Sequence, residues 1–275
     1  MTVQDVTQIV LRDMTADDIP AVADLCFEQQ WPHREEDLEK LLAIGSGLVA
    51  EVDGKTCGSI MSWRFGKSYA MLGVVIVAVA QQGRGLGRRL AEAMLQRLED
   101  VTVILNATDE GLPLYSRLGF APLGQVHQHQ GVAPIQPLVE LRPGERVRPM
   151  GAADAGALDA LYSSATGMDR KAVLDALLAD GSAVVLCREH VQTGFAVIRR
   201  FGRGWLIGPV VAPDATGAKA LIAHWLGMQA GSFCRMWVLG GVGPFGVHFS
   251  VLGVAPAPVP GDDVAIFALA AQALG

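Results

Sequence analysis

A glycine-rich segment with three arginines is the strongest chemical signal in this sequence. Residues 82–89 read QGRGLGRR and lie between a long apolar run and a stretch with apolar residues at i+4 spacing. The first backbone N–H groups of a helix have no partner within the helix and carry partial positive charge. Because glycines let an anion approach these groups closely, the segment predicts a cradle for a pyrophosphate.

Three other interpretations of this segment fit less well. A plain strand-to-helix turn needs a single glycine, whereas this segment has three at alternate positions. A Walker A loop requires Gly-Lys followed by Ser or Thr, which is absent. A nucleotide-dependent oxidoreductase would have Gly-x-Gly-x-x-Gly and an acidic residue at the end of the next strand. Here the pattern is Gly-x-Gly-x-Gly, and the next predicted strand ends at Asn106.

Two segments together resemble the GNAT acetyltransferase superfamily. The pattern Gln82-x-x-Gly85-x-Gly87 after an apolar strand is similar to the acetyl-CoA signature of that family. Residues 106–120 resemble its later motif, in which a helix carries a tyrosine, here Tyr115, ahead of a Leu-Gly-Phe sequence that opens the last strand. Residues 31–33, Trp-Pro-His, resemble a subgroup that has a second, GNAT-like C-terminal domain. The resemblance covers the first half well and the second half weakly.

The resemblance implies acetyl-CoA as co-substrate, without a metal, and a role for particular residues. Main-chain groups of one strand would hydrogen-bond the pantetheine arm, namely Val75, Ile76 and Val77. The pyrophosphate would be held by the backbone amides of Gln82, Gly83, Arg84, Gly85, Leu86, Gly87 and Arg88. Asn106 would contact the cofactor near its thioester, and Tyr115 would be the general acid. Residues 79–81, Val-Ala-Gln, stand where relatives often have proline and an acidic residue, which affects the expected shape of the loop.

Acyl transfer from a thioester to an amine has two requirements. The first is a proton donor for the leaving thiolate, and the second is a hydrogen-bond donor for the carbonyl oxygen. Tyr115 suits the first role, because a phenol carries its proton at neutral pH. The simpler alternative is an aromatic ring packed under the last strand. Backbone N–H groups near Val77 suit the second role. Because no cysteine or serine lies in a nucleophile motif, we expect direct transfer within a ternary complex.

The base and the acceptor site are less closely defined. Glu28 and His33 flank Trp31 in the region where the acceptor of the family lies, and Glu28 is our candidate base. His127 and His129 alternate along the last predicted strand and therefore share a face. Trp31 and the three histidines are candidate acceptor-binding residues, although solvated strand histidines are the more ordinary interpretation of the last two. The amine can also lose its proton to water.

The first half is expected to form a mixed sheet with helices on both faces, an α/β (α+β) fold. A capping box at Thr15 and Asp18 opens the first helix, and Asp53-Gly54 predicts a hairpin. The expected strands are 9–12, 48–52, 56–63, 71–80, 101–105 and 120–129, and further helices are expected at 34–43, up to 98, and at 112–118.

The second half repeats the first and has lost its chemical groups. Residues 147–150 echo residues 11–14 at an offset of 136, and residues 249–256 echo residues 115–122 at an offset of 134. Pro213 and Asp214 stand in place of the glycine turn, and Phe249 in place of Tyr115. We expect an acetyltransferase domain at 1–136, a linker near 137–144, and a degenerate GNAT-like domain at 145–275. The second would cover the sheet edge of the first and wall the acceptor pocket.

The composition excludes several classes of protein. With 51% apolar and 18% charged residues, the chain can bury a core, and a net charge of −6 argues against nucleic-acid binding. The apolar run 71–80 is too short to cross a membrane, and no signal peptide is apparent. Four dispersed cysteines, Cys26, Cys57, Cys187 and Cys234, predict reduced core thiols.

We therefore expect a cytoplasmic monomer or homodimer that acetylates a small-molecule amine or an amino acid. A non-catalytic acyl-CoA sensor is the alternative, in which both halves keep the shape and one keeps the cofactor.

Overall fold

A computed structural model describes residues 9–136, 139–239, 247–253 and 258–275. Part of the predicted linker, residues 137–138, and part of the second echo, residues 254–256, lie outside the described residues. In the parts that are described, no helix is both long and apolar enough to cross a membrane.

The first half contains the predicted series of strands and helices. The strands are β1 (Ile9–Asp13), β2 (Ser46–Val52), β3 (Lys55–Phe65), β4 (Tyr69–Val77), β5 (Thr102–Ala107) and β6 (Ala121–Val132). The helices are α1 (Ile19–Glu28), α2 (Glu35–Ala43), α3 (Leu86–Arg97) and α4 (Leu112–Arg117).

The end of β4 corrects the expected strand 71–80. The ladder with β3 ends where Val77 pairs with Gly58, and Val79–Gln81 forms a turn of 3-10 helix. Val79 is 55% exposed, so its apolar character does not reflect burial in the sheet. The early end of the strand leaves room for the glycine turn to lead into α3.

The second half repeats this order of elements up to its fifth strand. Its strands are β7 (Glu145–Pro149), β8 (Ser182–Arg188), β9 (Val191–Phe201), β10 (Gly204–Ala212), β11 (Phe233–Leu239), β12 (Val247–Gly253) and β13 (Ala265–Ala268). Its helices are α5 (Ala155–Thr166), α6 (Lys171–Asp180) and α7 (Ala215–Met228).

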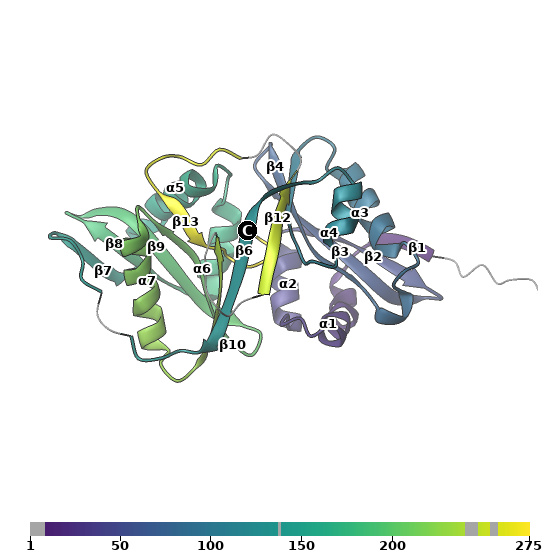
Figure 1. The fold of residues 1–275 in the computed structure, drawn as a ribbon, viewed down its shortest axis with the longest axis horizontal. Helices are drawn as coiled ribbons and strands as arrows, with labels where there is room; N and C mark the ends of the chain where they lie inside the picture. Colours follow the sequence, from purple (N-terminus) through teal and green to yellow (C-terminus); the bar gives the residue numbers. More distant parts are fainter. Residues whose placement is uncertain (1–8, 137–138, 240–246, 254–257) are drawn as a thin grey trace, which may run out of the picture.

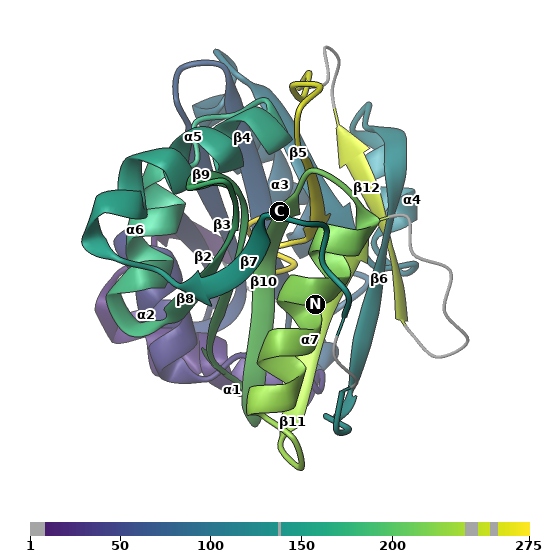
Figure 2. The same ribbon diagram turned by 90° about the vertical axis from the view of Figure 1, so that its left-hand side faces the viewer.

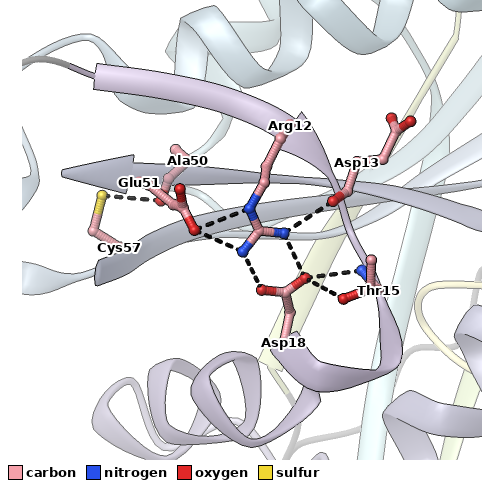
Figure 3. A network of polar contacts seen from close by, with 7 residues as sticks. All are labelled: Arg12, Asp13, Thr15, Asp18, Ala50, Glu51 and Cys57. Carbon is pink, nitrogen blue, oxygen red and sulfur yellow. Dashed lines mark hydrogen bonds and ion pairs between the residues drawn. The ribbon is translucent and has the colours of Figure 1, made fainter. Parts of the chain in front are cut away.

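A matching ion pair fixes the first strand-to-helix connection in each half. Arg12 donates from both Nη atoms to the two carboxylate oxygens of Asp18, at 2.8 and 2.6 Å (Figure 3). These hydrogen bonds lower the pKa of Asp18 to about 2, and the same carboxylate accepts from the backbone N–H of Thr15. Arg148 makes the same two bonds to Asp154, both at 2.7 Å. The repeat seen in the sequence is therefore a repeat of structure.

The two halves exchange one strand each, β6 and β12. Over the described residues, the strands form one 13-stranded sheet in the order β1-β2-β3-β4-β5-β12-β6-β11-β13-β10-β9-β8-β7. Strand β12 of the second half pairs antiparallel with β5, and β6 of the first half pairs antiparallel with β11. Figure 1 shows β6 and β12 side by side at the centre of the molecule. The expectation that the second half covers the sheet edge of the first is confirmed.

The exchange also corrects the proposed equivalence of Phe249 and Tyr115. Tyr115 lies on helix α4, whereas Phe249 lies on strand β12 and pairs with Val126 of β6. The letters shared by the two segments therefore belong to different elements. The expected domain boundary at 136 and 145 stays a prediction, because the sheet continues across it.

Helices cover both faces of the sheet. One face is covered by α1 and α2 of the first half and by α5 and α6 of the second (Figure 2). Side chains of all four helices contribute to one shared apolar core. On the other face, α3 covers the first half and α7 covers the second. Trp225 and Trp237 are buried, whereas Trp205 is half-buried beneath the Arg200 guanidinium. The four cysteines are free and buried.

Candidate active site

Strands β4 and β5 separate halfway along their length. They pair in parallel from Tyr69–Thr102 to Leu72–Leu105, and their pairing ends there. Just beyond, Val74 has a left-handed φ of 50°, and its carbonyl accepts a hydrogen bond from Ser59 Oγ at 3.0 Å. The bulge keeps β4 on β3 while β5 diverges. The main chain at 75–77 therefore faces an opening on the β5 side. Main-chain groups exposed in this way can pair with a ligand in extended conformation.

The N-terminus of α3 faces the same opening. Gly83 and Gly85 have left-handed φ values of 74° and 79°, which glycine adopts without strain. A Cβ added to either would have no described atom within 4 Å, so the turn is open on its outer side. No described side chain caps this helix, and its first turn has no acidic residue. Its first N–H groups are therefore available to an anion.

These two features bound a cleft of about 750 Å³. It is lined by most of the residues expected to bind the cofactor, Val75, Ile76, Val77, Gln82, Gly83, Gly85, Leu86, Gly87 and Arg88. Arg84 differs, because its guanidinium donates to the side chain of Gln81. Asn106 lies at the inner end of the cleft, in a chamber of about 60 Å³.

Three other residues that line the cleft have no recognisable signal in the sequence, namely Gln29, Thr108 and Glu110. Gln29 directly follows α1, and its Nε2 donates to the carbonyl of Val77 at 2.6 Å. Gln82 Nε2 donates to the same carbonyl at 3.2 Å. That carbonyl is therefore already engaged from two sides. The contact of Gln29 depends on how α1 packs on the sheet, which local sequence does not report.

Tyr115 lies between the cleft and its inner chamber and lines both. Its ring packs edge-on against Phe120 with centroids 5.8 Å apart, and 6% of the residue is exposed. Burial raises the pKa of Tyr115, because it disfavours the phenolate. The hydroxyl makes no hydrogen bond to any residue that the structure describes. The phenol therefore keeps its proton at neutral pH.

Around Trp31 the structure separates the candidate acceptor residues. Trp31 lines both the cleft and the chamber. Glu28 accepts a hydrogen bond from the backbone N–H of Val79 at 3.2 Å. His33 packs edge-on against Phe201 of β9 at 5.3 Å, and its Nδ1 is buried without a partner among the described residues. Burial lowers the pKa of His33 to about 4, so its imidazole is neutral at pH 7.

The two strand histidines lie away from the cleft. His127 and His129 are on β6, opposite Val238 and Met236 of β11. His129 lines a separate hollow of about 260 Å³, which Leu226 of α7 also lines. Neither histidine is among the described residues that line the cleft or its chamber, so an acceptor role for them stays a prediction. Within the described ranges, no cluster of side chains has the composition of a metal site.

The corresponding corner of the second half is closed. Asp214 caps α7, and its Oδ1 accepts from the backbone N–H of Gly217 at 2.9 Å. Strand β13 lies between β10 and β11 and pairs with β10 where Ile266 faces Val211. A carboxylate therefore occupies the helix N-terminus, and a strand of the same chain occupies the split. Both features agree with a degenerate second domain.

Comparison with known proteins agrees with this architecture. The family described as "Acetyltransferase (GNAT) domain" matches residues 10–136 and, through a second domain type of the same description, residues 158–239. The uncharacterised N-acetyltransferase YitH of Bacillus subtilis is 29% identical over 205 residues, which cover 73% of this chain and 72% of that protein.

Solved structures show the same fold. A protein from Pyrococcus horikoshii described as an acetyltransferase superposes with a TM-score of 0.78 at 20% identity, covering 100% of this chain and 98% of the other. A tandem GNAT protein from the clavulanic acid biosynthesis pathway superposes with a TM-score of 0.60 at 12% identity, covering 94% and 98%. The two matched domains together span more than half of the chain, and the chain therefore belongs to the GNAT acetyltransferases as an N-acetyltransferase with two GNAT domains in tandem.

Proposed function

We propose that the protein transfers an acetyl group from acetyl-CoA directly to the amine of a small molecule or an amino acid. The observation that carries this proposal is the uncapped N-terminus of α3, which opens onto a cleft that ends at a protonated tyrosine. Acetyl-CoA supplies the acetyl group as a thioester. The residues present fit it, because left-handed glycines keep side chains away from the helix amides that would meet its pyrophosphate.

The first half divides the work of binding between two elements. The amides at 82–88 would hold the pyrophosphate, and the main chain at 75–77 would hold the extended pantetheine arm. Asn106, in the inner chamber, would lie near the thioester. The carbonyl of Val77 is occupied by Gln29 and Gln82, so N–H groups of this strand are the candidate donors to the thioester oxygen.

Tyr115 is the proposed general acid. A proton held at its Oη at neutral pH would neutralise the thiolate as it leaves. The acceptor amine must reach this point uncharged. Glu28 is the candidate base, and loss of the proton to water is the alternative. Trp31, which lines both spaces, would pack against the acceptor.

The free, buried cysteines support a cytoplasmic location for the enzyme. The proposed partner is a small amine, and no partner of nucleic acid or membrane is proposed. Whether the protein acts as a monomer or a homodimer stays a prediction.

Calorimetry with acetyl-CoA tests the binding step, and thiol release across amino acids, polyamines, aminosugars and peptides tests the transfer. We expect binding and release with at least one amine. Absence of binding at several hundred micromolar, roughly a hundred times a low-micromolar affinity, contradicts the proposal. Binding without release on any acceptor would instead support a sensor.

Replacement of Tyr115 by phenylalanine tests the acid. Tyr115→Phe removes the proton and keeps the ring against Phe120, so we expect kcat to fall by about 10²–10⁴ while acetyl-CoA affinity changes little. Tyr69→Phe, at the opposite end of β4, is the matched control and should retain wild-type kcat. Equal turnover in Tyr115→Phe and wild type would exclude Tyr115 as the acid.

A further inference from the structure

Two residues from the second half of the chain line the inner chamber, and we call them its floor. The chamber shares lining residues with the outer cleft, Trp31, Val75, Thr108, Gly111 and Tyr115, so the two spaces adjoin each other. Its remaining walls are the diverging strands at 72–74 and 105–107. The floor is formed by Gln272 and Ala273, which follow strand β13.

This floor is fixed to both strands of the split. Asn106 Nδ2 on β5 donates to the main-chain carbonyl of Gln272 at 2.6 Å, and Gln272 Nε2 approaches the carbonyl of Asn106 at 3.4 Å. On β4, a Cβ built on Gly73 would lie 2.8 Å from the Cβ of Ala273. Ala273 thus contacts the strand where only glycine fits. The segment can neither approach the strands more closely nor withdraw without losing these contacts.

The size of the chamber limits what it can hold. Its volume is about 60 Å³. An apolar cavity of about 150 Å³ accommodates benzene, which is roughly 25 Å³ for each carbon. The chamber therefore has room for about two or three carbons.

We propose that Gln272 is a specificity residue that restricts the acyl group of the donor to acetyl and propionyl. This inference rests on the proposed function, because the acyl group enters the chamber only if the rest of a CoA ester lies along the outer cleft. The other lining residues include Trp31, Asn106 and Tyr115, to which the proposed function already gives other roles. The Gln272 side chain is half-buried in the floor, and its removal would deepen the chamber.

A matched set of variants separates size from hydrogen bonding. Gln272→Ala shortens the side chain and keeps the main-chain carbonyl that accepts from Asn106. Gln272→Met keeps the length of the side chain but removes its amide. Gln229→Ala removes an equivalent side chain at the end of α7, away from the cleft. Thermal denaturation of each variant verifies that it folds.

Calorimetric titration of each protein with CoA, acetyl-CoA, propionyl-CoA, butyryl-CoA and hexanoyl-CoA measures the effect without an acceptor. In the wild type, overpacking should make butyryl-CoA bind about ten- to a hundredfold more weakly than acetyl-CoA. In Gln272→Ala, we expect this ratio to fall to about threefold or less, since the lost side chain relieves the clash. Gln272→Met and Gln229→Ala should keep the wild-type ratio.

An unchanged ratio in Gln272→Ala would overturn the inference and leave the proposed function intact. If the ratio also fell in Gln272→Met, the inference that the size of the side chain at position 272 limits the acyl group would be overturned. If the wild type bound none of the five compounds, the proposed function itself would fail.

Discussion

Burial shifts the pKa of Tyr115, which lines the cleft, and the pKa of His33, which packs against Phe201. For Tyr115 it favours the phenol, which is the form an acid needs, so the general-acid interpretation and the simpler interpretation of a packed ring are compatible. For His33 it favours the neutral imidazole, since the largest influence on its pKa is loss of hydration. Asp37 opposes this shift and Arg235 and Arg199 add to it.

His33 should make the fold sensitive to mild acid. Its pKa falls from 6.5 to about 4 on folding, so at pH 7 neither state binds a proton. Between pH 6.5 and 4 the unfolded chain binds a proton that the folded chain does not. The free energy of unfolding therefore decreases as the pH is lowered, by at most about 2 kcal/mol at pH 5. His33→Phe removes this contribution.

Urea denaturation at pH 7 and pH 5 measures it. The loss of unfolding free energy between the two pH values should be smaller in His33→Phe than in wild type by at most about 2 kcal/mol. His190→Asn, at an exposed turn, serves as the control and should lose as much as wild type. The same loss in His33→Phe would show that His33 titrates normally in the folded protein.

The contrast between α3 and α7 explains why one repeat keeps a site. Both helices follow an equivalent strand, and both begin with free amides. At α7 the carboxylate of Asp214 satisfies one of them and is itself paired with Arg142 at 2.7 Å. At α3 glycine stands at the cap instead. Relative to glycine, a capping side chain stabilises a helix by only about a few tenths of a kcal/mol, so α3 loses little stability by leaving its first amides free.

A pair of glycine substitutions tests this interpretation of α3. Gly85→Ala and Gly231→Ala each place alanine at a left-handed φ, 79° and 84°, with no described atom within 4 Å of the new Cβ. Each should lower stability by about 1–2 kcal/mol. Only Gly85→Ala should weaken acetyl-CoA binding, by about tenfold or more, because the methyl group and the relaxed turn disturb the amides. Equal affinities in the two variants would contradict the role of this turn.

The sequence predicted most of the helices and strands of the first half. Periodicity and turn chemistry predicted each strand and helix of the first half, and the Asp53-Gly54 turn forms with both residues at left-handed φ. The end of β4 was wrong by three residues, because the apolar residues after Val77 are no longer in the sheet. Phe249 was misplaced because short letter matches do not distinguish a helix from a strand.

At the scale of the whole molecule, the sequence did not predict the long-range contacts between the two halves. Exchange of β6 and β12 depends on which edges meet after more than a hundred residues of intervening chain, and no local pattern reports that. The same holds for Gln272, which lies in an alanine-rich segment without a motif and reaches the other half of the molecule. The candidate site was therefore predicted in its local part, residues 75–88. A wall from the second half was expected as well, but the sequence did not indicate that Gln272 and Ala273 would contribute to it.

The exchange should make the molecule unfold as one unit. Each half completes the sheet of the other, and further contacts cross between them, including Lys40 with Asp180 and the Arg170 guanidinium 4.2 Å from the ring centroid of Phe65. A half that unfolded alone would leave the partner with an unpaired strand edge. We therefore expect one calorimetric transition whose van't Hoff and calorimetric enthalpies agree.

A substitution remote from the cleft tests this cooperativity. Leu221 of α7 is fully buried in the second half, so Leu221→Ala should cost about 2–5 kcal/mol through the cavity it leaves. If the halves unfold together, the single transition should move down by roughly 5–15 °C, and the protein should lose acetyl-CoA binding at that lower temperature. A transition that splits in two, with binding lost only at the upper one, would show instead that the first half holds its fold without its exchanged partner.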